Sequence, residues 1–273
     1  MKPKNTKDGL LLAIDVGNSN ITFGLFRGNV IEHQWRLQSN PSKTSDEYGI
    51  ELAGILSYLY DESPKIDGAI IASVVPELVH QMTTICVRYL GIDPMIVGEG
   101  TKTGLILRVD NPREVGADRI INAVAGLELF GDGSPLILID VGTAITHDVV
   151  SANGEYLGGS IAPGMGIAAR ALTVGTSKLP RVELEIPDTS IGNNTEKAMQ
   201  VGIVRGYLGL IDGITESIIE EIQKKTQKKP RVIATGGFSN LLNQNLKHLD
   251  AVERDLTLFG LRIVYDRTVK AKR

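Results

Sequence analysis

The chain has 273 residues, of which 42% are hydrophobic, and it carries a formal net charge of -3. This length fits one large domain or two modest ones, and either arrangement can bury a substantial core. The nearly balanced charge gives no electrostatic reason to expect nucleic acid or an anionic membrane as a partner. The one local basic run, at residues 224–229, is interpreted as a solvated helix end.

Cysteine usage and hydropathy favour a soluble, cytoplasmic protein. Cys86 is the only cysteine, so no intramolecular disulfide can form, which fits a reducing compartment. No apolar run approaches the roughly 20 residues that a membrane-spanning helix needs. Met1 to Asp8 are rich in lysine but lack the apolar core of a signal peptide.

Two segments of the chain resemble each other. Residues 11–18 and 136–143 each form a short apolar run, as a buried strand would, that ends in Asp-Val-Gly and a small polar residue. Each run continues into a second strand-like stretch, at 21–26 or 145–150. Both copies then turn at glycine, in one case within an Asn-Gly pair, and enter a third strand.

Helices and further strands follow each copy of this pattern. An apolar strand at 70–73 precedes a helix that opens at Pro76, and one at 232–235 precedes a helix after Gly236-Gly237. The expected helices span about 44–60, 76–90, 115–130, 163–177 and 195–225, the last with apolar residues at helical spacing. We therefore predict an α/β fold with two similar halves, residues 1–130 and 131–273.

The repeated Asp-x-Gly motif indicates a nucleotide site. Glycine at such a turn lets a phosphate approach the backbone closely, and the preceding carboxylate can hold a hydrated Mg²⁺. One copy alone is more often an ordinary turn, but two copies on matched halves favour ATP. Walker A and Rossmann glycine motifs are both missing from the sequence.

This architecture resembles the acetate-and-sugar-kinase, Hsp70 and actin superfamily. The resemblance implies a duplicated ribonuclease-H-like (actin-like ATPase) fold with ATP in the cleft between its halves. The fold alone does not give the substrate.

Asn111 to Ile120 is the most informative stretch. Asp118 and Arg119 fall early in an expected helix, beside the small residues Gly116 and Ala117. A carboxylate can accept the proton of an attacking hydroxyl, and a guanidinium can bind an anionic substrate. The alternative is a helix-capping aspartate with an arginine on the surface.

Taken whole, from Leu12 to about Tyr265, the sequence resembles the type III pantothenate kinases. The motifs that carry this resemblance occur in the family's order: I-D-V-G-N-S-N at 14–20, T-S-D-E-Y at 44–48, A-S-V-V-P at 72–76, E-V-G-A-D-R at 114–119, D-x-G-T-A at 140–144, G-G-x-I-x-P-G at 158–164, K-L-P at 178–180, G-x-N-T at 192–195 and A-T-G-G at 234–237.

The resemblance implies roles for individual residues and for the assembly. Asp118 would be the general base, and Asp140 would ligate K⁺ or ammonium. Thr143 would contact ATP, and Thr195 would reach the substrate. The first ATP loop would consist of Asp15, Val16, Gly17, Asn18, Ser19, Asn20, Ile21 and Thr22, with Asp15 also next to Mg²⁺. The pantothenate site would be lined by Gly116, Ala117, Asp118 and Arg119. The family's homodimer would complete the acceptor site across the subunit interface.

Two positions depart from the commonest family pattern. Val109 stands where many members have a tyrosine that contacts the substrate, so we carry no role over to it. His147 stands where an aromatic residue is frequent, and we expect it to pack rather than to catalyse.

Other functions remain open at this point. The chain could be another small-molecule kinase of the superfamily, such as a sugar kinase, or an exopolyphosphatase. It could be a non-enzymatic regulatory factor, although no basic face or helix-turn-helix signal supports DNA binding. An actin-like filament protein would have no use for the G-A-D-R and G-x-N-T motifs.

Overall fold

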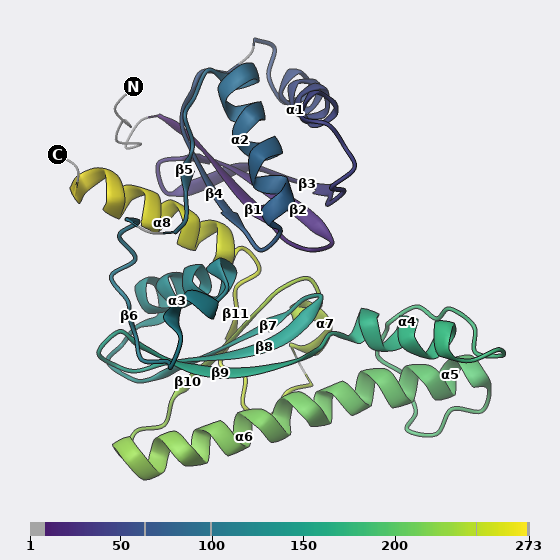
Figure 1. The fold of residues 1–273 in the computed structure, drawn as a ribbon. Coiled ribbons are helices and arrows are strands. Elements are labelled where there is room, and N and C mark those ends of the chain that lie inside the picture. Colours follow the sequence, from purple (N-terminus) through teal and green to yellow (C-terminus); the bar gives the residue numbers. More distant parts are fainter. Residues whose placement is uncertain (1–8, 63, 99, 244, 272–273) are drawn as a thin grey trace. The chain divides into compact units, whose positions relative to one another are not determined.

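The computed structural model describes residues 9–271 except residues 63, 99 and 244. The segment Met1–Asp8, on which the expectation about a signal peptide rests, therefore lies outside the described residues. The chain divides into two compact units, each with its own sheet (Figure 1). The first unit comprises Met1–Leu105, Arg113–Ala125 and Thr257–Arg273, and the second comprises Ile106–Pro112 and Gly126–Leu256.

The sheet of the first unit is a three-stranded meander extended by parallel strands. Its strands are β1 (Leu10–Val16), β2 (Asn20–Arg27), β3 (Val30–Gln38), β4 (Ile66–Ser73) and β5 (Met95–Ile96). They lie in the order β3-β2-β1-β4-β5, with β1 antiparallel to β2 and parallel to β4. Strand β1 is central and nearly all buried, which explains its almost continuous apolar sequence.

Helices supply the apolar side chains that cover both faces of this sheet. One face packs with residues of α1 (Ser45–Leu59) and α2 (Pro76–Leu90), and the other packs with residues of α3 (Ala117–Phe130) and α8 (Leu256–Ala271). A capping box between Thr44 and Glu47 begins α1. Pro76 opens α2, as predicted, and Gly91 ends it in the left-handed conformation.

The sheet of the second unit repeats this plan. Its strands are β6 (Ile106–Leu107), β7 (Leu136–Val141), β8 (Ala144–Val150), β9 (Glu155–Pro163), β10 (Arg231–Thr235) and β11 (Ala251–Val252). Their order is β11-β10-β7-β8-β9-β6. Read from β9 to β11, the meander and the parallel strands follow the sequence of the first sheet, and β6 is an addition at the edge.

The helical layer of the second unit is formed by one long helical stretch and a shorter helix. Figure 1 shows α5 (Thr195–Gln200) running into α6 (Gly206–Thr226), with the π-helical segment Val201–Arg205 between them. The helix α4 (Met165–Gly175) lies alongside the α5 end. Two short elements complete the chain, the 3₁₀ turn Pro112–Glu114 and α7 (Ser239–Leu242).

The duplicated α/β fold class is confirmed by the two matching sheets. The compact units nevertheless cross the expected boundary at residues 130 and 131. Helix α8 belongs to the first unit, because its Leu258 and Tyr265 pack where glycines of that sheet leave room, at Gly24 and Gly68. Strand β6 belongs to the second unit, because it pairs with β9.

Among the residues that the structure describes, none of the helices combines the length and the apolarity that crossing a membrane would require. Cys86 is fully buried in α2, and this burial raises the pKa of its thiol to about 12. The thiol is therefore protonated at neutral pH, as expected for an inert core residue.

Candidate functional site

The first Asp-x-Gly turn joins β1 to β2 and presents polar side chains to solvent. Asp15 lies opposite Thr22 in the strand register, and the Gly17 N–H donates to the Asn20 carbonyl at 3.0 Å. The side chains at the tip, Asn18, Ser19 and Asn20, are exposed, whereas Asp15 is half-buried. The turn can therefore offer backbone and side-chain donors to an anion, with one carboxylate close behind them.

Ser39, which directly follows β3, forms two hydrogen bonds with this turn. Ser39 Oγ donates to the Gly17 carbonyl at 2.5 Å, and the Ser39 N–H donates to the Ser19 carbonyl at 3.1 Å. These bonds fix the turn before any ligand binds, which lowers the entropic cost of binding.

The second Asp-x-Gly turn joins β7 to β8 and is one residue shorter. Asp140 lies opposite Thr146, and the Gly142 N–H donates to the Ala144 carbonyl at 3.0 Å. Thr143 is exposed at the tip and Asp140 is half-buried. The two turns thus repeat the same arrangement, an aspartate opposite a threonine with a glycine-containing turn between them.

Two glycines pack directly against the second turn. Gly164 donates its N–H to the Thr143 carbonyl at 2.9 Å, and a β-carbon there would collide with backbone atoms of Gly142 and Thr143. Gly236 has a φ of 92°, and a β-carbon there would meet the Asp140 carboxylate and lie 2.7 Å from the Val141 nitrogen. Gly164 therefore packs against the tip of the second turn and Gly236 packs against Asp140 at its base, and the sequence had offered no specific role for either glycine.

The G-A-D-R segment begins beside the carboxyl ends of β1 and β4 in the first sheet. A β-carbon at Gly116 would be 3.8 Å from Val74 Cγ1, and the Val74 N–H donates to the Val16 carbonyl at 3.0 Å. Val74 therefore lies between Gly116 and the end of β1, the strand that leads into the first turn. The structure brings the first phosphate turn and the predicted acceptor segment together within one unit.

Asp118 is half-buried in the first turn of α3, and its carboxylate accepts the Arg119 N–H at 2.8 Å. It also occupies the space that a β-carbon at Gly116 would need. A carboxylate here is favoured by the positive end of the helix. This local hydrogen bond is of the kind that the helix-capping interpretation of Asp118 expects. The carboxylate is nevertheless partly exposed, so a substrate can reach it.

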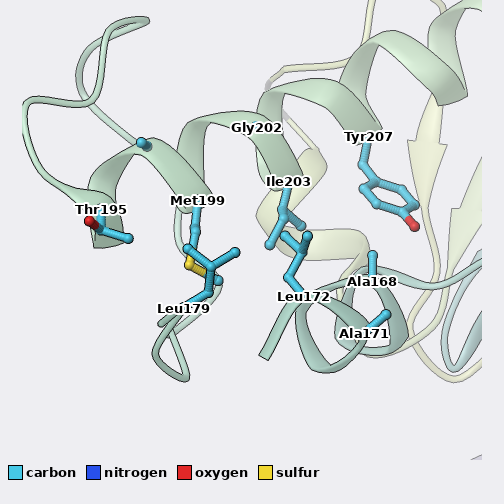
Figure 2. Close-up of a pocket in the computed structure, with 10 residues that line it drawn as sticks. Ala168, Ala171, Leu172, Leu179, Thr195, Met199, Gly202, Ile203 and Tyr207 are labelled. Atoms are coloured by element: carbon cyan, nitrogen blue, oxygen red, sulfur yellow. The ribbon is translucent and has the colours of Figure 1, made fainter. Parts of the chain in front are cut away.

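Thr195 lies elsewhere in the second unit, at the start of α5. It lines a pocket of about 760 Å³ whose other walls come mainly from α4 and the α5–α6 stretch, facing one another in Figure 2. Asn194 caps α5 by accepting the Lys197 N–H at 2.8 Å. The pocket is otherwise almost entirely apolar, with walls formed by Ala168, Ala171, Leu172, Leu179, Ala198, Met199, Gly202, Ile203 and Tyr207. Neither Asp140 nor Thr143 lines it, so the structure does not bring Thr195 together with the second turn there.

The two departures from the family pattern have packing contacts. Val109 lies against Gly158, 3.6 Å from where a β-carbon would stand. His147 is fully buried, with Nδ1 3.1 Å from Ser160 Oγ. Burial lowers the pKa of His147 to about 4, so the ring is neutral at pH 7.

The residues present suit a nucleotide-bound divalent ion better than a protein-held one. Among the described residues no three histidine, cysteine or acidic side chains gather into a metal cluster. Mg²⁺ usually takes only one or two carboxylates and completes its shell with phosphates and water. A single half-buried Asp15 behind the first turn fits that pattern, and Asp140 beside the close backbone of Gly236 fits one larger cation.

Comparison with known proteins gives a consistent family. The type III pantothenate kinase family model matches residues 11–217. Type III pantothenate kinases of Geobacillus sp. (strain WCH70) and Moorella thermoacetica are 44% and 48% identical over 263 and 258 residues. These alignments cover 96% and 94% of this chain, and 100% and 99% of the relatives.

Among solved structures, a putative Baf family transcriptional activator from Campylobacter jejuni aligns with 95% of this chain and 99% of its own. Its TM-score is 0.59 at 18% identity, which supports the fold alone. The family model spans most of the chain, and the sequence relatives match at high identity over nearly their full length. The chain belongs to the type III pantothenate kinase family.

Proposed function

We propose that this chain transfers the γ-phosphoryl group of ATP to the primary hydroxyl of pantothenate, forming 4'-phosphopantothenate, the first step toward coenzyme A. The observation that carries this proposal is the position of Gly116, at the start of G-A-D-R, beside the carboxyl ends of β1 and β4, where β1 leads into the first phosphate turn. The carboxylate of Asp118 and the guanidinium of Arg119 would then act beside a turn suited to phosphates. Such a site fits an acidic alcohol as the phosphoryl acceptor.

The first phosphate turn, Asp15 to Thr22, would bind ATP phosphates through its backbone and through the exposed Asn18, Ser19 and Asn20. Thr143, exposed on the second turn, would make a further contact. A divalent ion on the phosphates neutralises charge on the transferring group. Asp15 would hold that ion through its water shell.

Asp118 would act as the general base. The pantothenate hydroxyl oxygen forms the new bond to the γ-phosphorus, the bond from that phosphorus to the bridging oxygen of ADP breaks, and the hydroxyl proton passes to the Asp118 carboxylate. Arg119 would hold the pantothenate carboxylate, because guanidinium pairs with carboxylate through two parallel hydrogen bonds. Gly116 and Ala117 leave room for the substrate beside the helix.

A monovalent cation, K⁺ or ammonium, would bind at Asp140. The support is the half-buried carboxylate at the end of β7, with the Gly236 backbone so close that no side chain could stand between them. A cation there would compensate the charge of Asp140 beside the phosphate-binding turn.

The protein would work as a homodimer in which Thr195 serves the acceptor site of the partner. In support, the α4–α6 region exposes apolar side chains. Leu172, which lines the pocket of Figure 2, is 38% exposed, and Val174 and Ile191, which do not line it, are 79% and 84% exposed. The α5–α6 stretch has four exposed glycines, spaced three or four residues apart, and a β-carbon on any of them would meet nothing within 4 Å: Gly202, Gly206, Gly209 and Gly213. A helix with this many exposed glycines is costly by itself, at about 1 kcal/mol each. The cost is offset if another chain packs closely on that face. The reaction uses soluble metabolites, and we place it in the cytoplasm.

The activity is tested by incubating the purified protein with ATP and Mg²⁺ in K⁺ buffer. Candidate acceptors are pantothenate, glucose and N-acetylmannosamine, and ADP release is followed together with product mass. ADP release with pantothenate alone, and a product heavier by one phosphoryl group, is expected. A sugar as the preferred acceptor would assign the chain to another kinase activity of the same fold.

A further inference from the structure

A buried carboxylate on the second sheet has no part in the proposed mechanism. Asp148 in β8 is 1% exposed. Tyr156 Oη donates to its Oδ1 at 2.6 Å, and Thr146 Oγ1 donates to its Oδ2 at 3.1 Å. Tyr156 itself is fully buried, so two of the groups in this chain of hydrogen bonds lie in the interior.

The duplicated fold shows that the carboxylate is not needed to build the sheet. In the first unit Asp15 lies opposite Thr22, as Asp140 lies opposite Thr146 in the second. Two residues beyond Thr22 the first unit has Gly24, and Leu258 packs against it. The same position is thus filled by apolar packing in one half and by a carboxylate in the other. Burying a carboxylate costs free energy that apolar packing avoids, so its presence points to a specific use.

The position of Thr146 indicates that use. Residues directly opposite on antiparallel strands point to the same face, with β-carbons about 4.5–5.5 Å apart. Thr146 and Asp140 form such a pair at the end of the strands that flank the second turn. Because the Thr146 hydroxyl proton is directed to Asp148, the hydroxyl oxygen keeps its lone pairs for another partner.

We propose that Thr146 Oγ1 is a ligand of the monovalent cation at Asp140, and that Asp148 and Tyr156 are positioning residues that fix its orientation. This inference rests on the proposed cation at Asp140. A rotating hydroxyl would present its proton to a cation part of the time. A hydroxyl whose proton is held by a buried carboxylate presents only oxygen.

The arrangement suits a large, weakly hydrated cation. It provides the half-buried Asp140 carboxylate and the neutral hydroxyl oxygen of Thr146. Asp148 accepts the Thr146 hydroxyl proton, but in the strand register it pairs with Leu138 and not with Asp140. Replacing a hydration shell with few neutral oxygens is easier for K⁺ than for the more strongly hydrated Na⁺. Thr146 is therefore expected to contribute to the preference for K⁺ as well as to affinity.

The test uses full-length protein and two readouts, one of them independent of activity. The K⁺ concentration that half-saturates the kinase rate is measured in choline chloride buffer. The K⁺-dependent rise in melting temperature is measured without substrates, and Tl⁺ binding is followed by ²⁰⁵Tl NMR. Thr146→Val is compared with Thr146→Ser, Asp148→Asn and Tyr156→Phe. The control is Thr226→Val at the end of α6, which removes a hydroxyl that bonds only within its own helix end.

Thr146→Val should raise the half-saturating K⁺ concentration by about 100-fold, the upper end of the range for losing a residue that only supports a metal ligand. Thr146→Ser keeps the hydroxyl, so its half-saturating K⁺ concentration should stay close to the parent value. Asp148→Asn and Tyr156→Phe should raise this concentration by smaller factors than Thr146→Val does. Differences in melting temperature among the variants in choline do not bear on the result, because only the increment with K⁺ is compared. An unchanged K⁺ dependence in folded Thr146→Val overturns the inference while leaving the cation at Asp140 intact. A parent protein with no response to K⁺ in either readout overturns both.

Discussion

The acid sensitivity of the fold should depend on His147. The ring is fully buried, and its pKa is lowered to about 4 from an ordinary value of 6.5. Below pH 6.5 the unfolded chain binds a proton at this position, but the folded protein does not until about pH 4. The contribution of His147 to stability is therefore fully present above pH 6.5 and is lost as the pH falls toward 4.

The size of this loss follows from the two pKa values. Each unit of pKa difference corresponds to 1.36 kcal/mol, so the difference sets an upper limit of about 3 kcal/mol. Between pH 7 and pH 5 the expected loss is about 2 kcal/mol. Replacement by a phenylalanine, which cannot bind a proton, should abolish this part of the pH dependence.

The assay is urea unfolding of the parent and of His147→Phe at pH 7, 6 and 5, at one protein concentration. The two proteins share His33, His80 and His248, so the titration of these groups cancels in the comparison. The parent should lose about 2 kcal/mol more than the variant between pH 7 and pH 5. Parallel pH profiles would show that His147 takes up a proton freely in the folded state, which would refute the role given to its burial.

Two further predictions concern the second unit. Gly236→Ala should lower the free energy of unfolding by about 1–3 kcal/mol and weaken ATP binding, because its φ is 92° and a methyl group would meet Asp140 and Val141. Gly237→Ala, where a β-carbon meets nothing within 4 Å, is the control, and equal melting temperatures and ATP affinities for the two variants would contradict this account. Leu172→Arg places a charge on the α4 side of the apolar pocket, so it should be a monomer in light scattering and inactive in the kinase assay. The control Val87→Arg, at an exposed position on α2, should stay dimeric. An active Leu172→Arg monomer would exclude a shared acceptor site.

Much of the fold follows from local patterns in the sequence. The apolar runs that end in Asp-Val-Gly are β1 and β7, and the expected helices at 76–90 and 195–225 match α2 and the α5–α6 stretch. Pro76 and the glycine turns identify element ends because their backbone preferences act locally.

Helix α8 shows what local patterns could not predict. Its sequence from Leu256 to Tyr265 is rich in β-branched and aromatic residues and contains Gly260, so propensity alone does not favour a helix. Packing decides the outcome, since Gly260 lets α8 approach Ile121 of α3, and Thr257 Oγ1 donates to Asn122 Oδ1 at 2.7 Å. Its membership in the first unit follows from these contacts between residues more than 100 positions apart.

The candidate site was predictable to a similar degree. The sequence identified both Asp-x-Gly turns and the G-A-D-R segment, because each is a continuous motif with a chemical rationale. It gave no reason to place Gly164 and Gly236 against the second turn, or Asp148 behind Thr146. Those contacts depend on strand register and on loops that return from distant parts of the chain.

The most direct test of the account measures the Asp118→Asn variant for kcat with pantothenate, for ATP affinity and for melting temperature. The asparagine keeps the shape of the side chain and can still accept the Arg119 N–H, but it cannot take the hydroxyl proton. Asp110→Asn, at an exposed position, is the matched control. The account predicts a fall in kcat of about 10²- to 10⁴-fold, with ATP affinity and melting temperature close to the parent values. A nearly normal kcat for Asp118→Asn, or a fall that only follows lost stability, would contradict it.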